Sequence, residues 1–247
     1  MRALLHAELI KLRTTRTFLA LVGAAVGLSM LLAGLVAALT EPTENSVLVD
    51  VFQSDTSGLF ILILAIVGIS GEWRHRTITS SLLAAPDRLR FLAAKTLAFA
   101  IAGSALSALI SIAVTVVGFA VLELRGLPTP DGGELVELYV RNAIVAALLG
   151  AFGVGIGALV RNQAIAIVGI LLFAFAVEPV LIALVPDVGR FAPIGALPTA
   201  ITDLDPEDTG LGDVDLIAPG LALLLMLGWI GAAFAGGAGL LRARDVD

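Results

Sequence analysis

Residues 71–95 read GEWRHRTITSSLLAAPDRLRFLAAK, a strongly basic stretch with long apolar runs on both sides of it. The stretch carries five Lys and Arg residues against two acids. A helix needs roughly 20 predominantly apolar residues to cross about 30 Å of hydrocarbon. We therefore expect the flanking runs to be membrane helices and the basic stretch to join them outside the hydrocarbon.

The composition of the whole chain indicates the same class of protein. Its 247 residues are 58% hydrophobic and 15% charged, whereas soluble domains are about 45–50% apolar and about 25% charged. Only helices and closed barrels span lipid, and barrel strands alternate apolar with polar residues. The apolar runs here are continuous, so we predict an all-α, polytopic membrane protein. With no cysteine, disulfides, thiolate catalysis and cysteine-based metal sites are excluded.

The apolar runs predict six membrane helices in one transmembrane domain covering residues 1–247. Their expected bounds are about 17–39, 55–70 (or from 57), 96–122, 138–160, 164–185 and 216–241. Acidic loops are expected at 40–54 and 123–137.

Two further segments are predicted to lie at the membrane surface. Residues 1–16 are basic, with leucines at helical spacing, and we expect an interfacial helix there. The alternative for this segment is a solvated N-terminal turn. Residues 186–215 include a proline-rich, mildly apolar piece that is too short to cross, so we expect an external loop with one or two short re-entrant helices.

The basic residues are segregated along the chain, which predicts its orientation. With the N-terminus inside, the inner segments hold 12 Lys and Arg residues and the outer loops hold 3. Cytoplasmic loops carry the excess of such residues. We therefore predict cytoplasmic termini and a cytoplasmic 71–95 stretch, in the plasma (inner) membrane of a prokaryote.

The sequence offers little for catalysis or cofactor binding. It lacks a phosphate-binding G-x-x-x-x-G-K-[ST] motif and an H-E-x-x-H motif. Gly68-Ile69-Ser70-Gly71 matches the GxSG motif of rhomboid-like proteases, but a serine nucleophile needs a nearby base. The only histidines, His6 and His75, lie in the cytoplasmic flanks. We assign no catalytic, cofactor or metal residues and interpret Ser70 as part of a small-residue helix end.

Glu178 is the one ionisable residue well inside a predicted span, and Pro179 follows it. Carboxylates in hydrocarbon are costly, so they usually face a bundle interior or a cavity. One interpretation is a place on the transport pathway or in a proton or cation step. The other is a structural carboxyl group, hydrogen-bonded to a neighbouring helix beside a proline kink.

Residues 71–95 also show a pattern of individual residues. An acid and a basic residue precede a threonine, a Leu-Leu pair, a proline, a basic residue and a lysine that leads into the third span. The residues are Glu72, Arg74, Thr77, Leu82, Leu83, Pro86, Arg88 and Lys95. This pattern resembles the loop between the second and third helices of ABC-2 type transporter permeases. Glu8, Lys11 and Arg13 in the N-terminal segment are similar to that family as well, and the resemblance extends over essentially the whole chain. Arg76 departs from it, because the family often has glycine there.

The resemblance implies a permease subunit that exports a small hydrophobic or amphipathic molecule, such as a drug, an antibiotic or a lipid. Two separate ATP-binding subunits would hold ATP–Mg and dock on residues 1–16 and on the 71–95 coupling elbow. A second permease subunit, identical or different, would complete the pathway, and no nucleic acid is implied. The residues implied in coupling are Glu8, Lys11, Arg13, Glu72, Arg74, Thr77, Pro86, Arg88 and Lys95. A non-transport membrane protein, such as an immunity or sensor-anchoring factor, is the alternative, and an intramembrane enzyme is less favoured.

Overall fold

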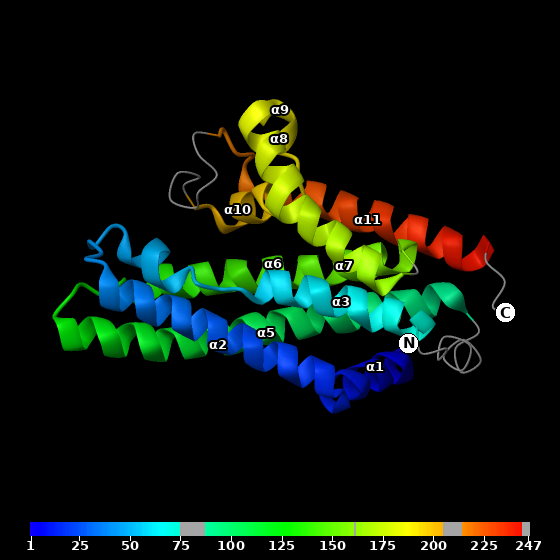
Figure 1. Ribbon diagram of the computed structural model, residues 1–247, viewed down its shortest axis with the longest axis horizontal. Coiled ribbons are helices and arrows are strands. Elements are labelled where there is room, and N and C mark those ends of the chain that lie inside the picture. The colour runs from blue at the N-terminus through cyan, green and yellow to red at the C-terminus, as the bar shows by residue number, and fades with distance from the viewer. Residues whose placement is uncertain (75–86, 161, 205–213, 244–247) are drawn as a thin grey trace.

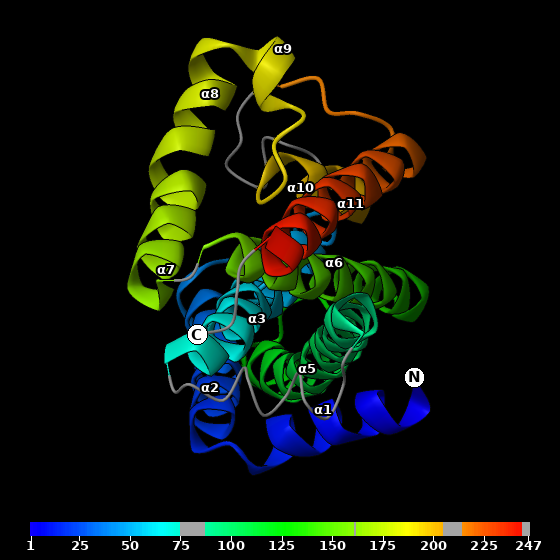
Figure 2. The same ribbon diagram turned by 90° about the vertical axis from the view of Figure 1, so that its right-hand side faces the viewer.

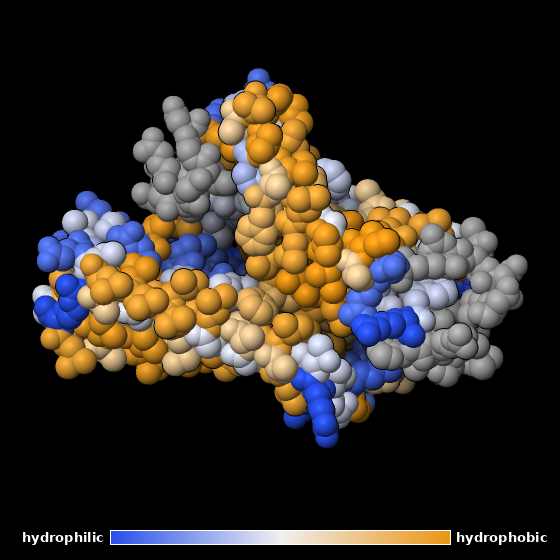
Figure 3. All heavy atoms as spheres, in the orientation of Figure 1, coloured by the Kyte–Doolittle hydropathy of each residue, from blue (hydrophilic) through white to orange (hydrophobic). Residues whose placement is uncertain are grey.

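The computed structural model describes residues 1–74, 87–160, 162–204 and 214–243, with side chains as far as Leu241. Every element in these ranges is helical, and they include six helical segments long and apolar enough to cross a membrane, the fifth made of α7, η2 and α8. The predicted all-α fold with six spans is therefore confirmed. Figure 3 shows apolar surface along α2 and over the fifth span, as expected for helices that face lipid.

The helices follow one another in an antiparallel bundle (Figure 1). In chain order they are α1 (Arg2–Thr14), α2 (Arg16–Leu39), the π-helical η1 (Leu48–Phe52), α3 (Ser57–Arg74), α5 (Arg88–Arg125), α6 (Gly132–Leu159), α7 (Gln163–Leu172), η2 (Phe173–Val177), α8 (Glu178–Leu184), α9 (Pro186–Gly189), α10 (Ala196–Thr202) and α11 (Pro219–Ala243). The N-terminus, the end of α3, the start of α5 and the end of α11 lie at one end of the bundle. We call it the N-terminal end.

Polar caps set the bounds of the third and fourth spans. Asp87 accepts hydrogen bonds from the Leu89 and Arg90 amides at 3.1 and 3.2 Å, so α5 begins at Arg88, about two turns before the apolar span predicted from about residue 96. At its other end Gly126, with φ 66°, terminates the helix in a left-handed conformation that glycine adopts readily. Asp131 caps α6, which starts at Gly132 and not near residue 138. Both helices therefore extend beyond the predicted apolar spans by polar helical turns.

Helix α6 lies at the centre of the bundle because its glycines let two neighbours approach closely. A Cβ atom added at Gly150 would lie 2.5 Å from the Phe99 carbonyl oxygen of α5, and one at Gly153 would lie 2.7 Å from the Leu62 carbonyl oxygen of α3. Small residues at such contacts are typical of helix packing in membranes. This surface therefore fixes how α3 and α5 lie against α6.

Gly153→Val is expected to destabilise the folded protein by about 1–3 kcal/mol, because the added atoms meet backbone that cannot move aside. Gly228→Val in α11 is the matched control, since nothing lies within 4 Å of a Cβ at that position. The measurement is the thermal-unfolding midpoint of the purified protein in detergent. Equal midpoints for the two variants would contradict this packing.

The second span is interrupted, which the sequence did not predict. Residues 48–52 form η1, Gln53–Thr56 leave the helical conformation, and α3 starts at Ser57. Val51 and Phe52 are fully buried, so the second half of the predicted 40–54 loop belongs to the bundle. The break is fixed by Thr56, whose hydroxyl donates to the Ala25 carbonyl of α2 at 3.2 Å.

The fifth span bends before Pro179 and stands apart from the bundle in Figure 2. The π-helical turn η2 separates α7 from α8; proline lacks an amide donor and clashes with the preceding turn, which disrupts regular α-helix there. Short helices α9 and α10 follow within the 186–215 segment, and their re-entry into the membrane stays a prediction. The acidic residues 205–213 lie outside the described ranges.

Candidate functional site

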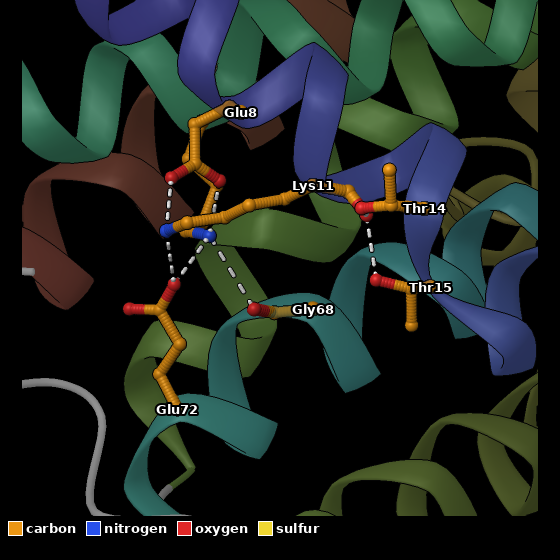
Figure 4. A network of polar contacts seen from close by, with 7 residues as sticks. Glu8, Lys11, Thr14, Thr15, Gly68 and Glu72 are labelled. Carbon is orange, nitrogen blue, oxygen red and sulfur yellow. Dashed lines mark hydrogen bonds and ion pairs between the residues drawn. The ribbon is translucent and has the colours of Figure 1, made fainter.

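Four charged side chains from three helices meet at the N-terminal end of the bundle (Figure 4). Lys95 Nζ of α5 lies 2.6 Å from Glu8 Oε2 of α1 and 3.0 Å from Glu72 Oε1 of α3. Lys11 Nζ of α1 lies 2.8 Å from Glu8 Oε1 and 3.2 Å from Glu72 Oε1. We call these four residues the charge cluster. It joins the N-terminal helix to both helices that flank residues 75–86.

Lys95 is the most deeply buried member of the charge cluster. Its side chain is 2% exposed, against 50% for that of Lys11. An ammonium group has three donors, and Lys95 also donates to the Gly68 carbonyl oxygen at 3.4 Å. A buried charge is tolerated when it is paired and hydrogen-bonded, and here two carboxylates balance two ammonium groups. The cluster therefore links three helices through a buried ammonium group and the two carboxylates that pair with it.

Local sequence features bring these groups together. Glu8 and Lys11 are three residues apart in α1, a spacing at which helical side chains meet. Gly68 lets α3 approach α5 closely, since a Cβ there would lie 2.3 Å from the Phe99 ring. That approach brings the Gly68 carbonyl within reach of Lys95. The same glycine belongs to the GxSG motif, so its role in the sequence is packing and hydrogen bonding.

The charge cluster shifts the pKa values of both α1 members. Burial opposes ionisation of Glu8, but Lys95 and Lys11 outweigh it, and the pKa of Glu8 falls below its ordinary 4.5. Burial likewise disfavours the charged form of Lys11, but its hydrogen bonds and attraction to Glu8 and Glu72 raise its pKa above 10.5. Both shifts favour the ionised forms of Glu8 and Lys11 while α1 is packed against α3 and α5, an arrangement called docking below.

The contact of α1 with the bundle is therefore expected to depend on pH at both extremes. A lowered carboxyl pKa stabilises docking above the ordinary value and is lost as pH falls through the shifted value. A raised lysine pKa stabilises docking below pH 10.5, and that contribution is lost above the shifted pKa. Protease cleavage in α1 should be slow and constant from about pH 5 to 10 and faster below about pH 4.5. With Glu8→Gln, the acid step should shrink; an unchanged step would contradict its assignment to Glu8.

The structure brings together Glu8, Lys11, Glu72 and Lys95 of the residues implied in coupling and places others elsewhere at the same end. Arg13 lines a separate groove between α1 and α5. Arg74 Nη1 lies 3.4 Å from Gln163 Oε1 at the start of the fifth span. Arg88 donates to the Leu241 carbonyl of α11. Thr77 and Pro86, like Arg76, lie outside the described residues.

A cavity of about 690 Å³ adjoins the charge cluster, a feature the sequence did not predict. Lys11, Arg74 and Gln163 lie at its wall together with apolar residues of α2 and α3, among them Phe18 and Leu64. Pockets for small molecules are mostly apolar with a few polar groups. This one can take a molecule that has an apolar body and a polar end.

Glu178 and Ser70 do not belong to the charge cluster. Glu178 is 1% exposed, and its Oε1 accepts hydrogen bonds from the Gly195 and Ala196 amides at 2.6 and 2.9 Å. It therefore ties the fifth span to the start of α10, an arrangement that fits the structural interpretation. Ser70 is buried, and its hydroxyl donates to the Ile66 carbonyl oxygen of its own helix at 2.6 Å.

No protein-family model and no curated protein matches this chain. The likeness to ABC-2 permeases therefore stays a prediction, based on the residues quoted above.

Proposed function

We propose that this chain is the membrane subunit of an ABC-2 type exporter, with ATP hydrolysis on a separate subunit that docks at the N-terminal end. The observation that carries the proposal is the charge cluster. It joins α1 to the last turn of α3 and to the second turn of α5. A partner that moves α1 or residues 75–86 would thereby displace two membrane helices together.

The charges of this end suit a soluble partner with an acidic surface. Arg13, Arg74 and Arg90 are exposed there, and the positive-inside rule makes it the cytoplasmic end. Charge complementarity of this kind steers association and fixes the register of the two partners. The expected partners are two ATP-binding subunits and a second permease subunit, identical or different.

The substrate proposed for this exporter is a small hydrophobic or amphipathic molecule. The cavity beside the charge cluster supports this choice, because an apolar wall and a charged end with both basic and acidic side chains face the same space of about 690 Å³. A drug, an antibiotic or a lipid-like molecule has this distribution of polarity. ATP–Mg would be held by the partner subunits and not by this chain.

Co-expression with a candidate ABC-type ATP-binding subunit tests the proposal. The complex should purify as a unit, and its ATP hydrolysis should respond to amphipathic compounds. Arg13→Glu with Arg90→Glu should reduce co-purification about tenfold or more, as reversal of complementary charges does. Glu134→Lys is the control, since Glu134 is exposed at the opposite end of the bundle. A complex that assembles equally with both variants would contradict docking at the N-terminal end. A chain that binds no ATP-binding subunit would favour the non-transport alternative.

A further inference from the structure

A second polar site lies at the break in the second span, well away from the charge cluster. Asp55 Oδ2 accepts a hydrogen bond from the Ser107 hydroxyl of α5 at 2.6 Å. Ser107 follows Lys95 by 12 residues in the same helix, or roughly 18 Å at 1.5 Å per residue. The break is therefore inside the span of the bundle and not at its surface. Backbone that leaves the helical conformation at such depth is tolerated where it lines a cavity or is buried in protein.

A cavity of about 230 Å³ is present at this break. Its polar lining includes Gln53, Asp55, Thr56, Asn142, Thr199 and Thr202. These residues come from the break, from α6 and from α10, and Figure 3 shows a hydrophilic recess between the α9 end and the η1 end of the molecule. One water occupies about 30 Å³ of liquid, so the cavity has room for a cation with several waters or for an ammonium group.

The hydrogen bonds at Asp55 do not by themselves require a carboxylate. Asp55 Oδ1 accepts the amide of Ser57, the first residue of α3, at 2.7 Å, and Oδ2 accepts the Ser107 hydroxyl. Asparagine caps helices about as well as aspartate. It would hydrogen-bond to both the Ser57 amide and the Ser107 hydroxyl at a lower desolvation cost. The negative charge is thus unexplained by capping.

No counter-charge faces Asp55 in the described part of the chain. It forms no ion pair there with any Lys, Arg or His, whereas Arg141 of nearby α6 is paired with Glu137 and Asp203. An intramembrane carboxylate in a cavity usually pairs with another group or marks an ion or substrate path. Broken membrane helices are also where transporters place such sites.

We propose that the cavity beside Asp55 binds a monovalent cationic group, with the Asp55 carboxylate as counter-charge and the side-chain oxygens of Gln53 and Asn142 as neutral ligands. The group is either an alkali-metal ion or the ammonium end of an amphipathic molecule. Only the second source rests on the proposed exporter function. Binding can be measured without the ATP-binding subunit, so failure here would leave that function untouched.

The test uses the full-length chain in detergent and follows its thermal-unfolding midpoint. One arm titrates NaCl against N-methylglucamine chloride at constant ionic strength. The other titrates hexylammonium chloride against hexanol, which has the same alkyl chain without the charge. A shift with Na⁺ alone identifies the ion, and a shift with hexylammonium but not hexanol identifies the ammonium group. No shift in either arm overturns the proposal.

Asp55→Asn keeps the cap and removes the charge. We expect it to weaken the apparent affinity by at least about 30-fold, the lower end of the loss when one member of a buried charge pair is removed. Asp50→Asn is the matched control, because Asp50 is exposed on the same segment. Asn142→Lys supplies a tethered ammonium group in the cavity and should abolish the response while the protein stays folded. A wild-type response in Asp55→Asn or Asn142→Lys overturns the proposal.

Discussion

Lys95→Met is expected to destabilise the protein by about 3–5 kcal/mol, the usual cost of removing one partner of a buried ion pair. Methionine preserves the apolar stem of the side chain but leaves Glu8 and Glu72 facing each other with only Lys11 between them. The Lys95 ammonium group lies 2.6 Å from the Glu8 carboxylate and 3.0 Å from the Glu72 carboxylate, so its removal takes away two close ion pairs. The measurement is the thermal-unfolding midpoint, together with protease cleavage in α1, which should become faster.

Lys11→Met is the matched control for this prediction. Lys11 bonds the same two carboxylates, but its side chain is 50% exposed, and ion pairs of exposed groups contribute about 0–1 kcal/mol. Adding Glu8→Gln to Lys95→Met should recover part of the stability, because it removes one of the unpaired charges. Equal losses for Lys95→Met and Lys11→Met would contradict the ranking by burial.

Hydropathy predicted the spans, whereas the members of the charge cluster were singled out by the resemblance to ABC-2 permeases. Charged residues are costly in lipid, so in a chain this apolar each one near a span stands out. Glu72 and Lys95 were conspicuous because they close the basic stretch at residues 71–95. Their pairing was not predicted, because the two residues are 23 positions apart and meet through helix packing at Gly68.

The N-terminal helix shows what a periodic pattern alone misses. Leucine spacing predicted an apolar contact face, yet Glu8 is the buried residue of α1, at 6% exposure. Hydropathy treats glutamate as a surface residue, and only the partner lysine from α5 makes its burial favourable. An isolated helical pattern cannot include a partner that is 87 residues away in the chain.

The break in the second span was missed for a related reason. Gln53–Thr56 are polar, and nothing in the sequence indicates their partners in other helices. Thr56 donates to the Ala25 carbonyl, and Asp55 accepts from the Ser107 hydroxyl. Polar residues next to an apolar run favour a loop when only the local pattern is considered. How deep a residue lies in the bundle depends on how the helices pack, so the cavity at Asp55 can be identified only from the three-dimensional structure.

Glu178→Leu is expected to destabilise the protein by about 2–5 kcal/mol, because it leaves two backbone donors at Gly195 and Ala196 without their acceptor. The carboxylate accepts both amides through Oε1, and Ala196 is fully buried. Glu178→Gln keeps an acceptor in the same place and should lose less than about 1 kcal/mol. The unfolding midpoints of the two variants separate hydrogen bonding from charge. If glutamine proved as damaging as leucine, the negative charge would be the required feature, and the transport interpretation of Glu178 would gain support. If Glu178→Gln also exports substrate with an unchanged pH profile, the residue has no part in proton movement and its role is to hold the fifth span against α10.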